Sequence, residues 1–211
     1  MASRPVFQMI EKEPYCTIDN VEFQYYPGFS ITQKQKSIKS LHDEYLRNHQ
    51  KARVLEISSK SKLDIGVKLS AFNLMFKYQD TYISVECAFQ GSKVFELGGP
   101  YSDIYFKSSS EAKKDVRLRE SGRLTKFTFD GVDYSLEPKD SFYNWIYINA
   151  LHNNELTNEV IQFDAFTDIE FNPQKSINCQ AKAVAIYVGL VKCNKIVAAL
   201  KSFEVFKSMI Y

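Results

Sequence analysis

The sequence predicts an α+β fold in which helices dominate, built as a single domain over residues 1–211. Residues 125–136 have the pattern of a β-hairpin, and several stretches of the C-terminal half have the pattern of helices. Strands and helices do not alternate regularly, as they would in a doubly wound sheet. With 45% apolar residues and no repeat, low-complexity tract or Pro/Gly/Ser linker, the chain is expected to be one globular domain.

A helix is expected early in the chain, over residues 30–49, with short strands around it. Ser30 or Thr32 can serve as its N-cap. Its apolar residues recur at near-helical spacing: Ile31, Ile38, Leu41 and Tyr45. The strands are predicted by their composition: one over residues 21–30, ending in a Pro27-Gly28 turn, a short one over 53–58, and an extended, largely buried segment over 67–76.

The hairpin is the clearest local prediction. Two β-rich runs in "TKFTFDGVDYSL" flank Asp130 and Gly131, a pair that readily takes the positive φ of a two-residue turn. Helices are predicted after it, and Pro138 suits the first turn of the first one. The predicted helices cover residues 138–152, 154–162, 176–192 and 195–209.

Composition excludes several classes of protein. The 27 Lys and Arg against 25 Asp and Glu leave a net charge of +2, so contact with nucleic acid requires a local basic patch. The first ten residues do not resemble a signal peptide, and the longest apolar run, 183–191, is too short to span a bilayer. Four scattered cysteines without a CxxC pair indicate reduced thiols, packed as small core residues in a cytoplasmic protein.

Familiar catalytic motifs are missing. The chain has no glycine-rich phosphate loop of the Walker or dinucleotide type and no GxSxG motif. Three histidines without an HxxxH pattern or a cysteine cluster make a zinc site unexpected.

The stretch "TYISVECAFQGSKVF" places charged residues inside an apolar, aromatic run. On a helix Glu86, Phe89, Gln90 and Lys93 would share one face, because seven residues make nearly two turns. A carboxylate and an ammonium in an aromatic pocket would have shifted pKa values, as at catalytic sites. The alternative is that each charge meets another partner at the surface of the helix.

Acids alternate with phenylalanines in "FDAFTDIEFNPQKSINCQ", residues 163–180. Asp168 is a candidate pocket residue, and Asn178 is expected at the start of a helix. The alternative is that Asp168 or Asn172 caps a backbone turn. Trp145, the only tryptophan, is either a core residue or a flat surface on which a base can stack.

Two basic runs are either solvated helix faces or a rim that binds phosphate. They contain Lys34, Lys36 and Lys39, then Lys113, Lys114, Arg117, Arg119 and Arg123.

The order of these elements resembles the NADAR family. "KLSAF", "SVECAFQGSK", "GR", a tryptophan in an aromatic helix and an aspartate before "INCQAKA" follow one another as in that family. The flanking text, including "YPGFSITQKQKSI", "VFELGGPYSD" and "INALHNNELTNE", is similar to NADAR antitoxins paired with DarT-type toxins, over nearly the whole chain. Two departures are Ala71, where relatives often have asparagine, and Phe171, where many have a tryptophan–glycine pair.

The resemblance implies a NADAR (YbiA-like) fold and a set of site residues. Glu86, Lys93 and Asp168 would be catalytic. The residues expected to bind the substrate are Ser70, Phe72, Phe89, Gln90, Trp145, Asn178 and Arg123.

The resemblance also implies a function. The enzyme would remove ADP-ribose from guanine bases in DNA by cleaving the N-glycosidic bond, and so reverse the modification made by a DarT-type toxin. Neither a metal nor a bound cofactor is implied, and no membrane. The guanine would be single-stranded or flipped out, and the toxin is a partner at least in function. Two alternatives are a module that binds ADP-ribose or the toxin without chemistry, and an N-glycosidase that acts on a small ribosylated metabolite.

Cleavage of this bond requires an anion near the developing oxocarbenium ion and a proton donor for the departing nitrogen. Glu86 is the expected carboxylate, and Asp168 would hold the ribose hydroxyls or orient water. Lys93 would either stabilise negative charge or attack the anomeric carbon to form a transient imine; we favour the attack.

Overall fold

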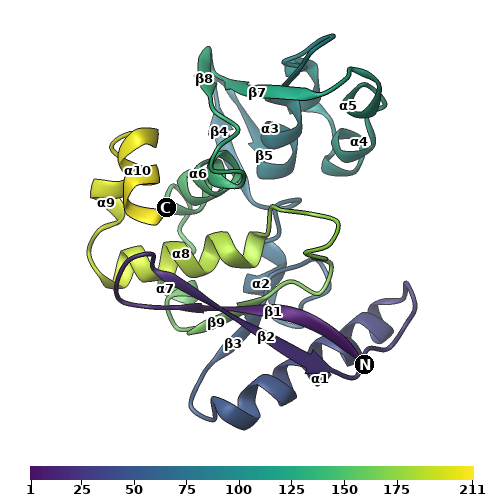
Figure 1. The fold of residues 1–211 in the computed structure, drawn as a ribbon, viewed down its shortest axis with the longest axis vertical. Helices are drawn as coiled ribbons and strands as arrows, with labels where there is room; N and C mark the ends of the chain where they lie inside the picture. The colour runs from purple at the N-terminus through teal and green to yellow at the C-terminus, as the bar shows by residue number, and fades with distance from the viewer. The chain divides into compact units, whose positions relative to one another are not determined.

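The computed structural model describes all residues 1–211, and its contacts divide the chain into two compact units. Unit 1 comprises Met1–Ser70 and Glu155–Tyr211, and unit 2 comprises Ala71–Asn154. The structure confirms the α+β class, with 41% helix and 20% strand in small sheets (Figure 1). Each unit is described below by itself.

Unit 1 contains a four-stranded sheet in the order β2-β1-β9-β3. Its strands are β1 (Ala2–Met9), β2 (Cys16–Phe23), β3 (Val54–Glu56) and β9 (Ala165–Thr167). β1 pairs antiparallel with β2 and β9, whereas β3 and β9 run parallel, with Glu56 opposite Thr167. The residues at the carboxyl ends of β3 and β9 therefore lie at the same edge of the sheet.

Helices cover this sheet on both sides (Figure 1). α1 (Ile31–Asn48) packs against β2, and α8 (Gln180–Lys192) packs against β1 and β9. The predicted α1 is confirmed, with the Ser30 hydroxyl accepting the Gln33 N–H. One core cluster consists of Val6, Phe23, Ile38, Leu41, Tyr45, Ala165 and Ile169. The remaining helices of unit 1 are α2 (Asp64–Lys68), α7 (Thr157–Val160), α9 (Ile196–Ala199) and α10 (Phe203–Ile210).

Several predicted elements differ from the structure. Of the strand predicted over 21–30 only residues 21–23 belong to β2, and of the helix predicted over 154–162 only α7 is helical. The segment 67–76 is not extended, because it begins with the end of α2 and only its last two residues belong to β4 (Met75–Tyr78). Its apolar residues are buried in turns, and a run of apolar residues does not distinguish a buried turn from a buried strand. The helix predicted over 195–209 is divided into α9 and α10, because Ser202 caps a new helix.

Unit 2 is built from two small sheets. β4 pairs with β5 (Thr81–Ser84), and β6 (Lys93–Phe95), β7 (Leu124–Phe129) and β8 (Val132–Tyr134) form the other sheet. The predicted hairpin is confirmed as β7–β8, and Asp130 and Gly131 turn with φ values of 49° and 75°. Both residues adopt the left-handed conformation that a tight hairpin requires.

The helices of unit 2 surround a buried aromatic cluster. They are α3 (Val85–Gly91), η1 (Ser102–Phe106), α4 (Ser109–Lys114), α5 (Arg117–Glu120) and α6 (Ser141–His152). The Phe89 ring of α3 lies 5.4 Å from the Phe127 ring and 5.2 Å from the Tyr143 ring, measured between centroids. α6 begins at Ser141 rather than at residue 138 as predicted, so Pro138 lies in the preceding turn and not in the helix.

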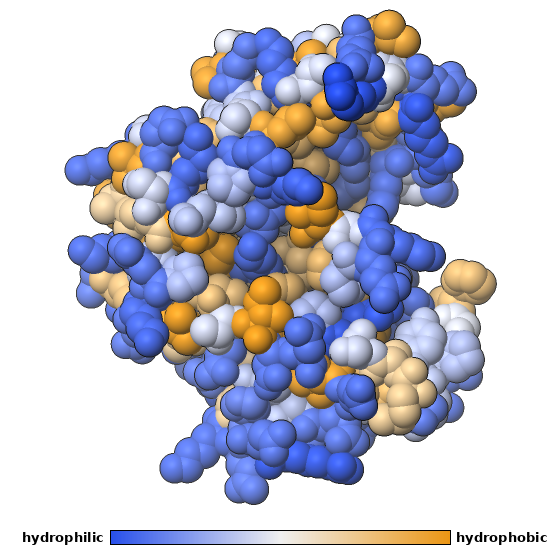
Figure 2. Space-filling view, in the orientation of Figure 1, coloured by the Kyte–Doolittle hydropathy of each residue, from blue (hydrophilic) through white to orange (hydrophobic).

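Hydrophilic residues cover much of the face drawn in Figure 2, with hydrophobic residues scattered among them. None of the helices has the length and apolar character needed to cross a membrane. The four cysteines are free thiols, and Cys16, Cys87 and Cys179 are buried, as expected for small core residues.

Candidate active site

Helix α3 carries the acid of the predicted site and is buried on every side. The Ser84 hydroxyl caps it by accepting the Cys87 N–H at 3.1 Å, and Glu86 lies in its first turn, where a carboxylate is favoured by the helix dipole. Every residue from Val85 to Gly91 is buried, including Glu86 at 7% exposed. A carboxylate is therefore held inside unit 2 by the backbone.

A single amide side chain connects the predicted acid and amine. Gln90 donates from Nε2 to Glu86 Oε1 at 2.9 Å, and Lys93 donates from Nζ to Gln90 Oε1 at 2.6 Å. A carboxylate can only accept and an ammonium can only donate, so the Gln90 amide has one orientation that satisfies both. Gln90 thus fixes the positions of both charged groups.

The predicted geometry of this group was wrong in one respect. α3 ends at Gly91, and Lys93 is the first residue of β6, so the four residues do not share one face of a helix. At the end of the helix the Ser92 hydroxyl and backbone N–H both donate to the Ala88 carbonyl, and the chain then enters β6. Lys93 reaches Gln90 from the strand that follows.

Burial makes the Lys93 ammonium more acidic, and an aromatic ring lies against it. Its Nζ lies 4.7 Å from the centre of the Phe89 ring. Burial lowers the pKa of Lys93 to about 8; Lys113 also lowers it, and Glu86 opposes the shift. At pH 7 about a tenth of the molecules would then carry a neutral amine, against about one in three thousand for an exposed lysine. This amine can act as a nucleophile near neutral pH.

Lys113 is a neighbour that we did not single out from the sequence. It lies on α4, exposed, with Nζ 5.3 Å from the centre of the ring of Phe72, one of the predicted substrate-binding residues. The sequence offered only its place in a basic run. Lys113 therefore brings a second cation to the same part of unit 2.

Of the other predicted residues, Trp145 and Arg123 are more exposed than Glu86, whereas Ser70 of unit 1 is buried. Trp145 lies half-buried on α6, and its indole is hydrogen-bonded to the Tyr134 side chain. Arg123 is exposed and pairs with Glu96 at 3.0 Å. Ser70 is buried in the last turn of the first segment of unit 1, where its N–H donates to the Val67 carbonyl.

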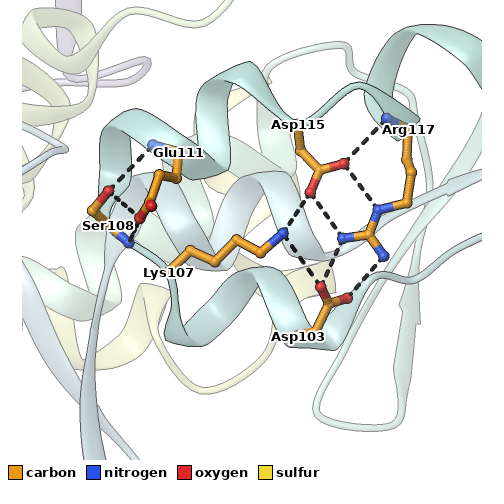
Figure 3. Close-up of polar contacts among 6 residues, drawn as sticks. All are labelled: Asp103, Lys107, Ser108, Glu111, Asp115 and Arg117. Carbon is orange, nitrogen blue, oxygen red and sulfur yellow. Dashed lines mark hydrogen bonds and ion pairs between the residues drawn. The ribbon is translucent and has the colours of Figure 1, made fainter.

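Part of the second basic run is neutralised by acids. Arg117 donates to both carboxylate oxygens of Asp103 and also to Asp115, and Lys107 contacts the same two acids (Figure 3). Arg117 and Lys107 hold the pKa of Asp115 far below its usual range. A guanidinium in such a fork has few donors left for phosphate, so the exposed Lys113, Lys114 and Arg119 are the better candidates.

Asp168 lies in unit 1, directly after β9, and is 8% exposed. Its Oδ1 accepts the Glu170 N–H at 3.0 Å, and Asn172 Oδ1 accepts the Gln174 N–H at 3.0 Å. Both side chains thus make the turn-capping bonds considered as the alternative. Burial, with the nearby Glu56 carboxylate, raises the pKa of Asp168 to about 8.

Glu56 is a buried acid that we missed in the sequence. It ends β3 and is 3% exposed. The sequence feature that could have identified it is an acid at the end of a short apolar strand, followed closely by two serines, in "LEISS". Because β3 and β9 are parallel neighbours, Glu56 and Asp168 come to the same edge of the sheet.

Asn178 does not begin a helix as predicted, because α8 starts at Gln180, with Cys179 as its N-cap. The Asn178 side-chain oxygen is buried and has no hydrogen-bond partner. Gln180 donates its amide to the Ile57 carbonyl at 2.6 Å, which connects the start of α8 to the end of β3. No three His, Cys, Asp or Glu side chains lie together as metal ligands would.

Similarity to known proteins extends over almost the whole chain. A family model described as a DarT1-associated NADAR antitoxin matches residues 2–211. No curated protein is significantly similar to the chain. Since the match covers almost the whole sequence, the chain belongs to the family of DarT1-associated NADAR antitoxins.

Proposed function

We propose that this protein is a glycohydrolase that removes ADP-ribose from guanine bases in DNA, and so reverses the modification made by its partner toxin. The observation that supports this most is the Glu86–Gln90–Lys93 chain of hydrogen bonds. It combines a buried carboxylate with an amine whose pKa is lowered to about 8. Membership of an antitoxin family directs that chemistry to the product of a toxin.

In the first step the neutral Lys93 amine attacks the anomeric carbon of the ribose. A bond forms between Nζ and that carbon while the bond from the carbon to the guanine nitrogen breaks, and the departing nitrogen takes up a proton. The carboxylate of Glu86 stabilises the positive charge that develops on the sugar. Gln90 holds the amine in place, so that little orientational freedom is lost when it attacks.

In the second step the ribose ring opens and water completes the reaction. A proton moves from Nζ to the ring oxygen as the ring opens, which leaves a protonated imine between Lys93 and the sugar. Water adds to the imine carbon, ADP-ribose leaves as the aldehyde, and Lys93 is regenerated with one extra proton, which passes to solvent. The sum is hydrolysis: modified guanine and water give guanine and ADP-ribose.

The remaining residues suit the parts of such a substrate. Trp145 offers a half-buried ring on which a base can stack. The exposed Lys113, Lys114 and Arg119 can contact phosphates.

The decisive test is hydrolysis of an oligonucleotide that carries ADP-ribose on a guanine amino group, followed by mass spectrometry. We expect the wild type to release ADP-ribose and restore the unmodified mass. Glu86→Gln and Lys93→Met should each slow turnover by about 100-fold or more, because each removes one reacting group. Sodium borohydride added during turnover should trap ADP-ribose on Lys93.

Matched controls separate chemistry from folding. Glu137→Gln and Lys77→Met remove an exposed acid and an exposed lysine of the same unit, and both should turn over like the wild type. If Lys93→Met turned over normally, the imine mechanism would be wrong. If Glu86→Gln still neutralised the toxin at full strength, a binding module would replace the enzyme. Activity confined to a free ribosylated nucleotide would favour the small-metabolite alternative.

A further inference from the structure

Two buried carboxyl groups of unit 1 lie at one edge of its sheet, and the proposed chemistry assigns no role to one of them. Glu56 ends β3, and Asp168 follows the end of the parallel strand β9. The residues on either side of Asp168 both bind Glu56: Thr167 through its hydroxyl and Ile169 through its backbone N–H. The two acids are therefore tied into one cluster.

Hydrogen bonding within this cluster is unequal. Glu56 accepts from the Ser58 hydroxyl at 2.7 Å, the Thr167 hydroxyl at 2.6 Å and the Ile169 N–H at 2.9 Å. A carboxylate with three donors is stabilised in its ionised form. Asp168 accepts one backbone N–H and one bond from the Gln180 amide. A single negative charge in the cluster is thus better held by Glu56.

No cation compensates this charge. His42 Nε2 lies 2.8 Å from the Thr167 oxygen, whose only hydroxyl proton is directed at Glu56. The imidazole therefore donates from Nε2, and as a neutral ring, because burial lowers the pKa of His42 to about 4. The other titratable groups near Asp168 are Glu170, paired with Lys34 at 3.3 Å, and the Cys179 thiol, whose pKa is raised by burial.

We propose that Glu56 is a positioning residue that keeps Asp168 as a neutral carboxylic acid at pH 7, able to donate a hydrogen bond or a proton. A second negative charge beside a buried, uncompensated carboxylate is unfavourable, so the pair keeps one proton at pH 7 and loses it only near pH 8. Two acids in different environments then have different roles, as acid–base catalysis requires.

The catalytic meaning of this arrangement rests on the proposed function. When the bond to guanine breaks, its electron pair goes to the departing nitrogen, which needs a proton. A neutral carboxylic acid can meet that need, because its O–H bond breaks as the N–H bond of guanine forms. The proton that Lys93 releases to solvent when the imine is hydrolysed replaces the one that the acid has given up, so the cycle closes without any other reactant.

Infrared difference spectroscopy of the free protein tests the protonation state without substrate. At pH 7 we expect the C=O band of a protonated carboxylic acid in the wild type, lost as the pH rises through about 8. The band should be missing in Asp168→Asn. In Glu56→Gln it should titrate at least one pH unit lower, because the neighbouring charge is gone. Glu170→Gln, which removes an exposed neighbouring acid, should move it much less.

Kinetics give the second readout. With modified DNA as substrate, turnover of the wild type should fall above about pH 8, and this falling limb should move to lower pH by the same amount in Glu56→Gln. Glutamine has the shape of glutamate, and the Ser58 and Thr167 hydroxyls can rotate to accept from its amide, so the variant should fold. If it does not, Glu56→Met serves instead: it removes the same charge with an apolar side chain of similar length, and the Asp168 band should again titrate lower.

The outcomes separate this inference from the proposed function. A wild type without the band at pH 7, a band that persists in Asp168→Asn, or an unmoved titration in Glu56→Gln would each overturn the role of Glu56, whatever the enzyme hydrolyses. Inactivity on modified DNA, with the infrared titration as expected, would overturn the glycohydrolase alone.

Discussion

The Lys93 ammonium donates a 2.6 Å hydrogen bond to the side-chain oxygen of Gln90. The other end of the same amide donates to Glu86, so the amine and the carboxylate are held apart by one neutral group rather than joined as an ion pair. A direct ion pair would raise the pKa of the lysine, whereas this arrangement leaves burial as the main influence on it. Gln90 is therefore the residue that keeps Lys93 reactive in our proposal.

Replacing Gln90 with leucine should impair both stability and turnover. Gln90→Leu leaves a buried carboxylate and a buried amine without their shared partner, which we expect to cost about 1–3 kcal/mol of unfolding free energy. Turnover should fall about tenfold to 100-fold, because the amine is no longer oriented. Denaturant unfolding and the oligonucleotide assay measure the two effects. Gln174→Leu, on an exposed loop, should change neither, and a fully active, fully stable Gln90→Leu would contradict the role of the amide.

Lys93 should make the stability of the protein depend on alkaline pH. Its pKa is about 8 in the folded protein and 10.5 in the unfolded chain. Between these values the unfolded chain binds a proton that the folded protein does not, so the unfolding free energy contributed by Lys93 increases with pH. Lys93→Met should therefore be more stable than the wild type below pH 8, and the difference should shrink towards pH 10. Urea titrations at a series of pH values measure it, and a constant difference would show that Lys93 is not buried.

Gly91 should not tolerate a side chain. A Cβ there would lie 2.4 Å from Cε1 of Tyr105 and 3.0 Å from the Tyr101 carbonyl oxygen, so η1 would have to move away from α3. We expect Gly91→Ala to lower the unfolding free energy by about 1–3 kcal/mol. Gly131→Asn is the matched control: the space around it is open and asparagine accepts positive φ, so its cost should stay below about 1 kcal/mol. Equal stability of the two variants would contradict the close packing of η1.

Cations of the second basic run should differ in their contribution to DNA binding. Arg117 is held by Asp103 and Asp115, so Arg117→Met should lower stability and leave the KM for modified DNA within about twofold. Lys113→Met with Lys114→Met should leave stability nearly unchanged and raise KM several-fold at low salt, with a weaker salt dependence. Thermal unfolding and KM at two salt concentrations separate the cases. If Arg117→Met raised the KM for modified DNA more than the replacement of the two lysines did, this assignment would be reversed.

Elements with strong local signals could be predicted from the sequence. α1 has a capping serine and a regular apolar spacing, and β7–β8 has the Asp130-Gly131 turn, so neighbouring residues decide both. The segment 67–76 could not be predicted in this way, because burial in a turn and burial in a strand select the same apolar residues. The same limit applies to 195–209, where only the packing shows that the chain breaks at Ser202.

The residues of the candidate site were found by their chemistry, but their partners were not. Polar side chains in an aromatic run identified Glu86, Gln90 and Lys93. The prediction placed all three on one helix, whereas α3 ends at Gly91 and β6 begins at Lys93. Asp168 was found and Glu56 was missed, because an acid at the end of a short strand looks ordinary until its neighbour is known. Lys113 was named only as a member of a basic run, and that place in the sequence does not reveal its effect on the pKa of Lys93.

The sequence by itself determined the α+β class, the family and the chemical identity of the groups that can react, because these depend on local patterns and on residue types. Only the tertiary structure decided which groups share protons and charge. Thr167 bonds Glu56 across 111 positions of the chain because two parallel strands place both at one edge of a sheet. Such a pairing brings buried carboxyl groups within range of one another, and no signal confined to neighbouring residues encodes that distance.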